Sequence, residues 1–222
     1  MRPLVILRPE PGARATAEAA RQLGLKPIVA PLFRLDPVEW QPPDPAEFDA
    51  LLLTSANGVA QAGDGLREFA SLPVYCVGEA TAAAARDAGL SVAGVGTSGV
   101  DALLDSIPSD VRLLHPCGVH RRAPSKRDVE ALPVYEAVAL PVPQALLGAA
   151  DAIIAVHSPR AGRRVRELAK SGEIDRAGLS IVAISEEAAT AAGPGWRAVE
   201  AAGEPTDAAL LAIASRLCKN PA

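Results

Sequence analysis

The chain has 222 residues, of which 49% are hydrophobic, 22% charged and 3% aromatic, and its formal net charge is −4 at pH 7. This length suits two small domains, and the composition excludes a disordered chain and predicts cores built from small aliphatic side chains. The negative charge argues against sequence-independent binding of nucleic acid, which needs an excess of basic residues.

We expect neither a signal peptide nor a disulfide framework in this sequence. The apolar run at residues 4–7 is too short for the core of a signal peptide, and no later run reaches the length of a membrane span. Cys76, Cys117 and Cys218 show no CxxC spacing, which favours buried, reduced thiols over disulfides. We therefore expect a cytoplasmic protein that contacts neither membranes nor nucleic acid.

Apolar runs of strand length alternate with alanine-rich helical stretches along the whole chain, a pattern typical of parallel sheets covered by helices. Ser158 followed by Pro159 predicts the start of a helix that ends at Gly172, and Ser98, Ser185 and Thr206 are expected N-caps of other helices. The expected strands, in chain order, are residues 4–7, 27–32, 50–53, 74–77, 92–95, 111–114, 133–139, 152–156, 180–184 and 198–200.

The chain repeats one βα pattern, and the two copies are offset along the sequence. Residues 49–57 resemble residues 151–160, since each segment has an acidic residue, an apolar strand and a helix that begins at serine. Residues 72–79 and 179–186 match in the same way. The second copy ends before its last two units, and segments that resemble these units are found within residues 4–33.

This offset predicts two similar lobes, each a parallel, flavodoxin-like sheet flanked by helices. Residues 36–139 would form a continuous α/β lobe, and residues 1–35 together with 140–222 a discontinuous one. The two crossings, at residues 31–37 and 135–143, are rich in proline and β-forming residues, which predicts a stiff hinge of two segments. We expect the working site between the lobes.

Polar and small residues gather where the predicted strands end, which is where ligands of doubly wound sheets bind. Each helix N-terminus there contributes only about 0.3–1 kcal/mol to anion binding, so the pattern favours a ligand with several acid groups. Simple N-capping is the alternative for each serine or threonine. The residues in question are Arg8, Thr54, Ser55, Asn57, Gly78, Thr81, Ser98, Gly118, Ser158, Arg160 and Ser185.

Two other motifs have an ordinary structural explanation. Residues 94–99 match the dinucleotide pattern G-x-G-x-x-G, but they follow the third strand of their repeat rather than the first, which favours a turn. His115, Cys117 and His120 place three metal ligands within six residues, but no second ligand pair accompanies them, so we expect no metal.

Basic residues concentrate in two places, residues 120–127 and the four arginines within residues 160–166. They are either solvated surface or cationic rims that attract a polyacidic ligand. Tyr135 stands where the chain crosses back between the lobes. It is either a packed aromatic or a phenol able to donate a proton to a leaving hydroxyl.

Six short motifs, taken in this order, resemble the uroporphyrinogen-III synthase family: Leu7-Arg8-Pro9, Leu53-Thr-Ser-Ala-Asn-Gly-Val59, Val77-Gly-Glu-Ala-Thr81, Pro133-Val-Tyr135, His157-Ser-Pro159 and Glu204-Pro-Thr206. The resemblance spans nearly the whole chain. It implies a lyase of haem biosynthesis without a cofactor, which cyclises the linear tetrapyrrole hydroxymethylbilane to uroporphyrinogen III and inverts ring D.

The resemblance also implies roles for single residues. By position, Tyr135 resembles the family tyrosine proposed to assist departure of the substrate hydroxyl, and Thr81 resembles a threonine of the cleft. Ser185 and Ala188 stand where the family usually has glycine and threonine, and residues 118–132 are short by about two helical turns of 3.6 residues. The substrate-binding residues we expect are Arg8, Ser55, Asn57, Gly78, Thr81, Gly118, Ser158, Arg160 and Ser185.

The expected partner is the linear tetrapyrrole substrate, with a transient contact to the upstream hydroxymethylbilane synthase, and the expected state is a monomer. Two alternatives stay open. The short segment 118–132 and Ala188 suggest a two-lobed ligand-binding or regulatory protein that lost catalysis. Residues 94–99 alone suggest an NAD(P)-dependent oxidoreductase.

Overall fold

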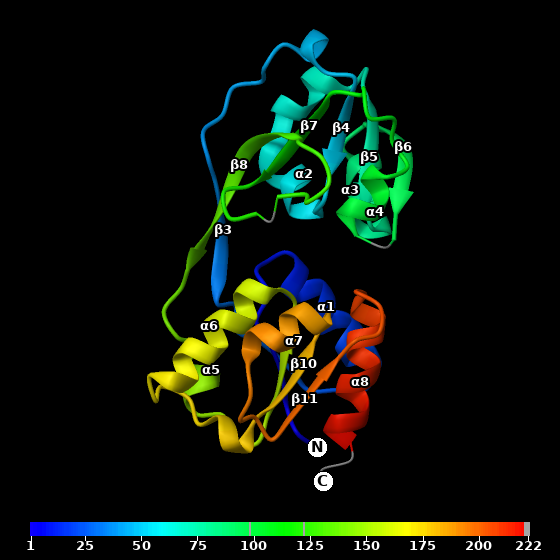
Figure 1. Ribbon diagram of the computed structural model, residues 1–222. Coiled ribbons are helices and arrows are strands. Elements are labelled where there is room, and N and C mark those ends of the chain that lie inside the picture. Colours follow the sequence, from blue (N-terminus) through cyan, green and yellow to red (C-terminus); the bar gives the residue numbers. More distant parts are fainter. Residues whose placement is uncertain (98, 122, 220–222) are drawn as a thin grey trace. The chain divides into compact units, whose positions relative to one another are not determined.

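The computed structural model describes residues 1–97, 99–121 and 123–219 and divides the chain into two compact units (Figure 1). One unit combines Met1–Arg34 with Ala139–Ala222, and the other is the continuous stretch Leu35–Val138. Each unit contains one β-sheet with helices packed against it, so the predicted α/β fold class is confirmed. Among the described helices, none has the length and apolarity needed to cross a membrane.

The discontinuous unit is built from the strands β1 (Leu4–Ile6), β2 (Pro27–Val29), β9 (Ile153–Val156), β10 (Ser180–Ala183) and β11 (Ala198–Ala201) and the helices α1 (Gly12–Gln22), α5 (Gln144–Leu147), α6 (Pro159–Lys170), η3 (Arg176–Gly178), α7 (Glu186–Ala192) and α8 (Asp207–Lys219). The five strands are parallel, in the order β11-β10-β9-β1-β2. The strands β1, β9 and β10 are entirely buried. Their continuous apolar sequences reflect this burial, because helices cover both faces of the sheet.

The continuous unit is built from the strands β3 (Phe33–Pro37), β4 (Ala50–Leu53), β5 (Pro73–Val77), β6 (Ser91–Gly96), β7 (Leu113–Gly118) and β8 (Glu130–Ala139) and the helices η1 (Pro45–Glu47), α2 (Ala56–Ala62), η2 (Gly63–Phe69), α3 (Glu79–Asp87) and α4 (Val100–Leu104). The strand order is β3-β8-β7-β4-β5-β6. Leu51 and Leu53 pack in a core with residues of α2 and α3, whereas Leu52 packs with Leu103 and Leu104 of α4. The alternation along β4 therefore supplies both faces of the sheet.

The strand β3 was not among the predicted strands, and it lies at the first crossing of the chain. It runs antiparallel to β8, since Val38 N donates to Val134 O (3.0 Å) and Leu140 N donates to Leu32 O (2.9 Å). This additional strand makes the sheet mixed, while β4 to β8 keep the predicted parallel arrangement. The two crossing segments are thus paired with each other.

The offset duplication is visible in the strand orders. The discontinuous sheet reads β2-β1-β9-β10-β11, and the parallel part of the other sheet reads β8-β7-β4-β5-β6. Both sequences of strands are the flavodoxin-like order 2-1-3-4-5 if β7 is counted as the first strand of its repeat. The units differ between their first two strands, because β1 and β2 are joined by α1, whereas the described residues between β7 and β8 form no helix.

Most of the predicted helix ends are confirmed. The hydroxyls of Ser158, Ser185 and Thr206 accept hydrogen bonds from the backbone N–H groups of Ala161, Ala188 and Ala209. The backbone of Gly172 has φ +80°, which ends α6 as expected. The predicted cap at Ser98 lies outside the described residues.

A buried arginine, Arg2, forms hydrogen bonds and an ion pair between the amino terminus and the sheet of the discontinuous unit. Arg2 is 5% exposed, and its Nη2 donates to Ala152 O (3.2 Å) and to Ser180 Oγ (3.0 Å). Its Nε lies 2.6 Å from Asp151 Oδ1. These partners are more than a hundred residues away along the chain, so Arg2 joins the two separate segments of this unit.

Candidate active site

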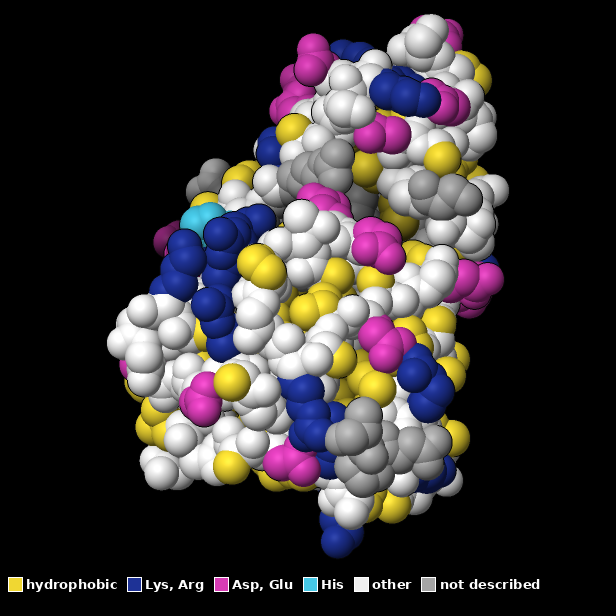
Figure 2. All heavy atoms as spheres, turned by 60° about the horizontal axis from the view of Figure 1, so that its bottom comes forward, with side chains coloured by type: hydrophobic (Ala, Val, Ile, Leu, Met, Phe, Trp, Pro, Cys, Tyr) yellow, Lys and Arg dark blue, Asp and Glu magenta, His cyan; other side chains and the backbone are white. Residues whose placement is uncertain are grey.

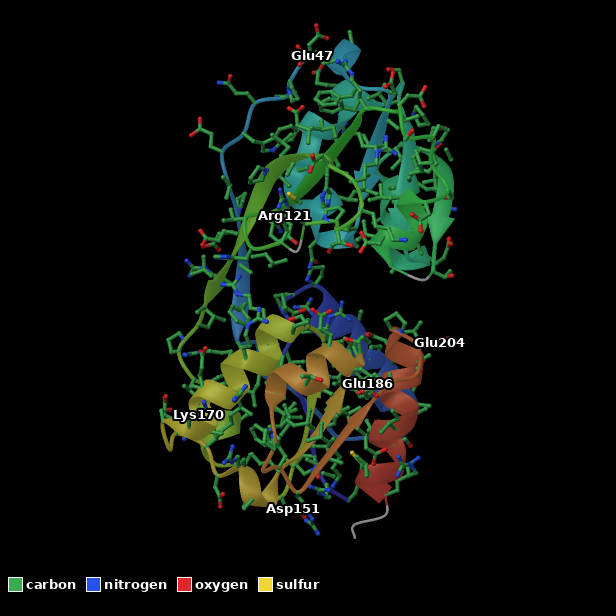
Figure 3. The ribbon with its side chains drawn as sticks, viewed as in Figure 1. Glu47, Arg121, Asp151, Lys170, Glu186 and Glu204 are labelled. Carbon is green, nitrogen blue, oxygen red and sulfur yellow. The ribbon has the colours of Figure 1, made fainter. Side chains whose placement is uncertain are left out.

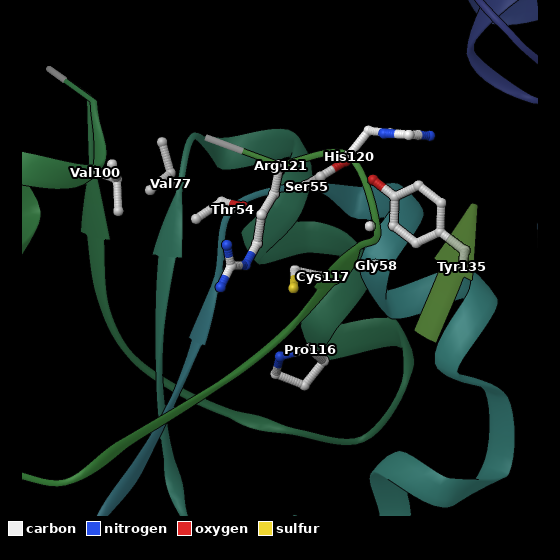
Figure 4. A pocket seen from close by; sticks show the side chains of 11 residues that line it. Thr54, Ser55, Gly58, Val77, Val100, Pro116, Cys117, His120, Arg121 and Tyr135 are labelled. Carbon is white, nitrogen blue, oxygen red and sulfur yellow. The ribbon is translucent and has the colours of Figure 1, made fainter. Parts of the chain in front are cut away.

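A cavity of about 310 Å³ lies at the carboxyl ends of β4, β5 and β7, within the Leu35–Val138 unit (Figure 4). The strand order reverses between β7 and β4, because the chain continues from β7 to one side and from β4 to the other. Such switch points are where doubly wound sheets bind ligands. The lining residues are Thr54, Ser55, Gly58, Val77, Val100, Pro116, Cys117, Gly118, His120, Arg121 and Tyr135.

The turn after β4 supplies hydroxyl groups to the cavity. Ser55 is the N-cap of α2, and its Oγ accepts a hydrogen bond from Asn57 N (3.1 Å). A β-carbon at Gly58 would lie 3.1 Å from Pro116 O, so the glycine allows α2 to pack closely against β7. Asn57 itself does not line the cavity, and only its backbone N–H takes part in the turn.

Tyr135 covers the backbone of the neighbouring strand. It is the register partner of Gly118, and a β-carbon on Gly118 would lie 2.9 Å from Tyr135 Cζ and 3.1 Å from its Oη. Burial raises the pKa of the Tyr135 phenol above 10.0, although a hydrogen bond with Ser55 acts in the opposite direction. The phenol is therefore protonated at neutral pH and able to donate a proton.

A buried histidine stands behind the hydroxyl of Thr54. His115 is 2% exposed, and its Nε2 lies 3.0 Å from Thr54 Oγ1. Burial lowers the pKa of His115 to about 4, and the charge of Arg121 acts in the same direction. The imidazole is thus neutral at pH 7. It lies in β7, which extends to Gly118, beyond the predicted strand end at residue 114.

The segment after β7 adds a cation to the cavity. The Arg121 side chain lies between Thr54 and Cys117 in Figure 4, and Figure 3 shows Arg121 at the end of the unit opposite Glu47. Burial raises the pKa of the Cys117 thiol, and a hydrogen bond with Arg121 partly offsets this effect. His120 lies at the rim, where its Nε2 is 3.2 Å from Glu136 Oε1.

The segment that carries Arg121 is held in place by α4 instead of forming a helix of its own. Ser125 donates to Asp101 through its backbone N (2.8 Å) and its Oγ (2.7 Å), and Lys126 Nζ lies 2.6 Å from Asp105 Oδ2. Because no helix forms in the described part of this connection, its first residues reach the cavity.

Of the predicted site residues in this unit, Thr54, Ser55, Gly118 and Tyr135 are brought together in the cavity. Gly78 caps α3 with φ +82°, and the buried Thr81 follows it, but neither lines the cavity.

In the discontinuous unit, the predicted Arg8 forms an ion pair. Its Nη1 lies 2.9 Å from Asp207 Oδ1 and 3.2 Å from Thr16 Oγ1, and His157 Nε2 lies 3.4 Å from the same carboxylate oxygen. Burial acts to raise the pKa of Asp207, but the contacts with His157 and Thr16 and the charge of Arg8 outweigh it and lower the pKa to about 2. This carboxylate joins elements that are distant in sequence, a contact that the sequence pattern does not predict.

The other predicted residues of this unit also have internal partners. Ser158 and Ser185 cap α6 and α7, where their hydroxyls accept from the backbone N–H groups of Ala161 and Ala188. Arg160 stacks over the ring of Phe33, with Cζ 4.6 Å from the ring centre. On α6, Arg163 is exposed and Arg164 lies 3.8 Å from Glu167. On the face shown in Figure 2, Lys and Arg side chains form one larger group beside a histidine and several smaller, separate groups.

Most of the chain matches a known protein family. The family model described as uroporphyrinogen-III synthase HemD matches residues 14–212. The chain belongs to the uroporphyrinogen-III synthase family. The resemblance inferred from the six short motifs is therefore confirmed, and with it a cyclising lyase of tetrapyrrole biosynthesis. Among curated protein sequences, no match was found.

Solved uroporphyrinogen-III synthases share the fold. The synthetase from Helicobacter pylori is similar with a TM-score of 0.61 and 18% identity, covering 98% of this chain and 100% of that one. A mutant synthase from the extremely thermophilic bacterium Thermus thermophilus is similar with a TM-score of 0.55 and 17% identity, again covering 98% of this chain and 100% of that one.

The glycine motif has a structural explanation in this uroporphyrinogen-III synthase family member. Gly94 and Gly96 lie inside β6, the edge strand, where a β-carbon would lie 3.0 Å from the ring of Tyr75 and 2.8 Å from Leu103 respectively. Gly99 precedes a helix of only five residues. The motif is therefore packing within a strand, and the family match argues against the oxidoreductase alternative.

Proposed function

We propose that the chain is a uroporphyrinogen-III synthase that closes hydroxymethylbilane to uroporphyrinogen III with inversion of ring D, and that Tyr135 is its general acid. The family match supports the reaction. The placement of a protonated phenol over Gly118, in a cavity at the switch point, is the observation that supports the role of Tyr135.

The first step breaks the C–O bond of the substrate's hydroxymethyl group. The Tyr135 phenol gives its proton to the departing oxygen, which leaves as water, while a pyrrole nitrogen supplies the electron pair and the substrate becomes an electrophilic azafulvene. Attack by the last pyrrole ring, rearrangement through a spiro intermediate and closure of the macrocycle follow. The proton lost at closure restores the phenol.

Control of geometry is the second task of the enzyme, because the free substrate also closes without inversion. Holding the reacting carbons in the productive arrangement is what favours the inverted product. In this proposal the substrate's carboxylates are bound by hydroxyls and backbone amides at the strand ends. The residues proposed for this are Ser55 and Gly118 in the cavity, Asn57, Gly78 and Thr81 elsewhere in the continuous unit, and Arg8, Ser158, Arg160 and Ser185 at strand and helix ends of the discontinuous unit.

The state and location of the enzyme are part of the proposal. The three cysteines are free and buried, which supports a reducing compartment such as the cytoplasm. We propose a monomer that receives its substrate in a transient contact with hydroxymethylbilane synthase. Light scattering of the purified chain, alone and mixed with that enzyme, measures both properties.

The isomer of the product tests the function. Purified protein is incubated with hydroxymethylbilane, the products are oxidised to porphyrins, and the isomers are separated by chromatography. The expected product is the type III isomer, in excess over a reaction without protein. If only the type I isomer appears, at the rate of spontaneous closure, the protein is a ligand-binding relative without catalysis.

A further inference from the structure

One wall of the cavity combines a cation, a hydroxyl and a buried imidazole. Arg121, Thr54 and Cys117 line it together, and His115 lies behind Thr54 (Figure 4). The proposed chemistry at Tyr135 uses none of these groups. The grouping of these side chains in one wall is therefore not explained by the proton transfer from Tyr135.

The imidazole of His115 determines which way the Thr54 hydroxyl points. His115 Nε2 lies 3.0 Å from Thr54 Oγ1, and Nδ1 is buried without a hydrogen-bond partner in the described part of the chain. A buried N–H without an acceptor is less favourable than a buried lone pair without a donor. The proton therefore belongs on Nε2, which donates to Thr54 and leaves the hydroxyl hydrogen free to point into the cavity.

The charge of Arg121 is not balanced by its neighbours in this wall. Burial raises the pKa of the Cys117 thiol and lowers that of His115 to about 4, so both groups are neutral at pH 7. The guanidinium thus presents a positive charge beside a hydroxyl donor, on the solvent-exposed side of the cavity. A planar fork of N–H donors matches the two oxygens of a carboxylate.

We propose that Arg121 and Thr54 form a carboxylate-binding subsite and that His115 is a positioning residue that fixes Thr54 as a donor. The inference rests on the proposed function for the identity of the ligand, an acidic tetrapyrrole. The cavity of about 310 Å³ accommodates only part of so large a molecule, so the subsite takes one side-chain carboxylate.

Direct binding tests the subsite independently of turnover. Uroporphyrin III, which bears eight carboxylates, is titrated into the protein and followed by its fluorescence, with its octamethyl ester as the uncharged probe. We expect Arg121→Gln to weaken binding of the acid by roughly 10- to 100-fold, and Arg121→Lys to weaken it less, because lysine keeps the charge but lacks the fork. Arg67→Gln is the matched control, since Arg67 is 77% exposed and outside the cavity.

The role of His115 has a separate readout. His115→Gln keeps an N–H donor near the position of Nε2, whereas His115→Leu removes it. We expect Thr54→Val and His115→Leu each to weaken binding severalfold, His115→Gln to restore most of the affinity, and His115→Leu to have no further effect in a Thr54→Val background. A merely structural role would give additive losses. The melting temperature of each variant checks that it is folded.

The results of these assays distinguish failure of the proposed subsite from failure of the proposed synthase activity. Wild-type affinity in Arg121→Gln, or equal binding of the acid and the ester, would overturn the subsite even if the protein makes the type III isomer. Additive losses, or no rescue by His115→Gln, would remove His115 from the proposal. In turnover assays, Arg121→Gln should raise KM more than it lowers kcat. If the protein binds the porphyrin through Arg121 but makes no type III isomer, the carboxylate subsite is supported and the proposed reaction is wrong.

Discussion

The ring of Tyr135 lies directly over the backbone of Gly118, its register partner on the adjacent strand, at a distance that leaves no room for a β-carbon. The phenol is held in the cavity by this contact. Two predictions concern this pair.

Replacing Gly118 by alanine should displace the tyrosine. The added β-carbon would come within 2.9 Å of Tyr135 Cζ, so the ring must move. Since misplacement by about 1 Å costs on the order of 100-fold in rate, we expect a large fall in kcat. Gly203→Ala is the control, because nothing lies within 4 Å of a β-carbon there. Equal activity of the two variants would show that the ring position is not important.

Removing only the hydroxyl of Tyr135 tests its chemistry. Tyr135→Phe keeps the packing, so we expect kcat to fall roughly 100-fold or more, with little change in melting temperature. The wild-type rate should also decline as pH rises past the raised pKa, above 10.0, where the phenol loses its proton. Tyr75→Phe, on β5 of the same sheet but outside the cavity, should retain wild-type kinetics. A wild-type rate for Tyr135→Phe would exclude this residue as the acid.

The carboxylate of Asp207 should make the protein sensitive to acid. Its pKa is about 2 in the folded chain and 3.8 ordinarily, so its contribution to stability is present above pH 4 and is lost as pH falls from 4 to 2. We expect Asp207→Asn to lower the free energy of unfolding at pH 7 and to flatten its dependence on pH in that window. Urea unfolding between pH 2 and 7 measures both. A slope identical to wild type would contradict the assignment.

Arg2 should contribute strongly to the stability of the discontinuous unit. Arg2→Met leaves the buried acceptors Ala152 O and Ser180 Oγ without this donor, at a cost of about 1–3 kcal/mol. We expect a lower urea midpoint at pH 7. Arg67→Met, at an exposed position, should stay within about 0.5 kcal/mol of wild type. Similar midpoints for both variants would refute a role for the buried contacts.

Much of the fold could be predicted because strands that are buried on both faces of a sheet have continuous apolar sequences. Strands such as β9 and β10 read as unbroken apolar runs. The strand β3 could not be predicted in this way, since only Phe33 of Phe33–Pro37 is buried and the segment contains two charged residues. Likewise, His115 and Pro116 look like loop residues, although β7 is buried throughout.

The candidate site was only partly predictable, because a sequence shows which residues follow a strand but not where their side chains go. Thr54, Ser55, Gly118 and Tyr135 could be found from strand ends and from the family resemblance. Arg121 belongs to a basic run, and nothing in that run tells which arginine enters the cavity. The ion pair of Arg8 depends on Asp207, which is 199 residues away along the chain.

The offset of the repeat has a consequence for biosynthesis. The strands β1 and β2 are made before the Leu35–Val138 unit, but β9, which pairs with β1 in the sheet, is made only after that entire unit. That unit can complete its sheet while translation continues, since domains generally fold as they emerge. The nascent amino-terminal strands, with an open edge, must meanwhile be kept from pairing wrongly until the later segment arrives.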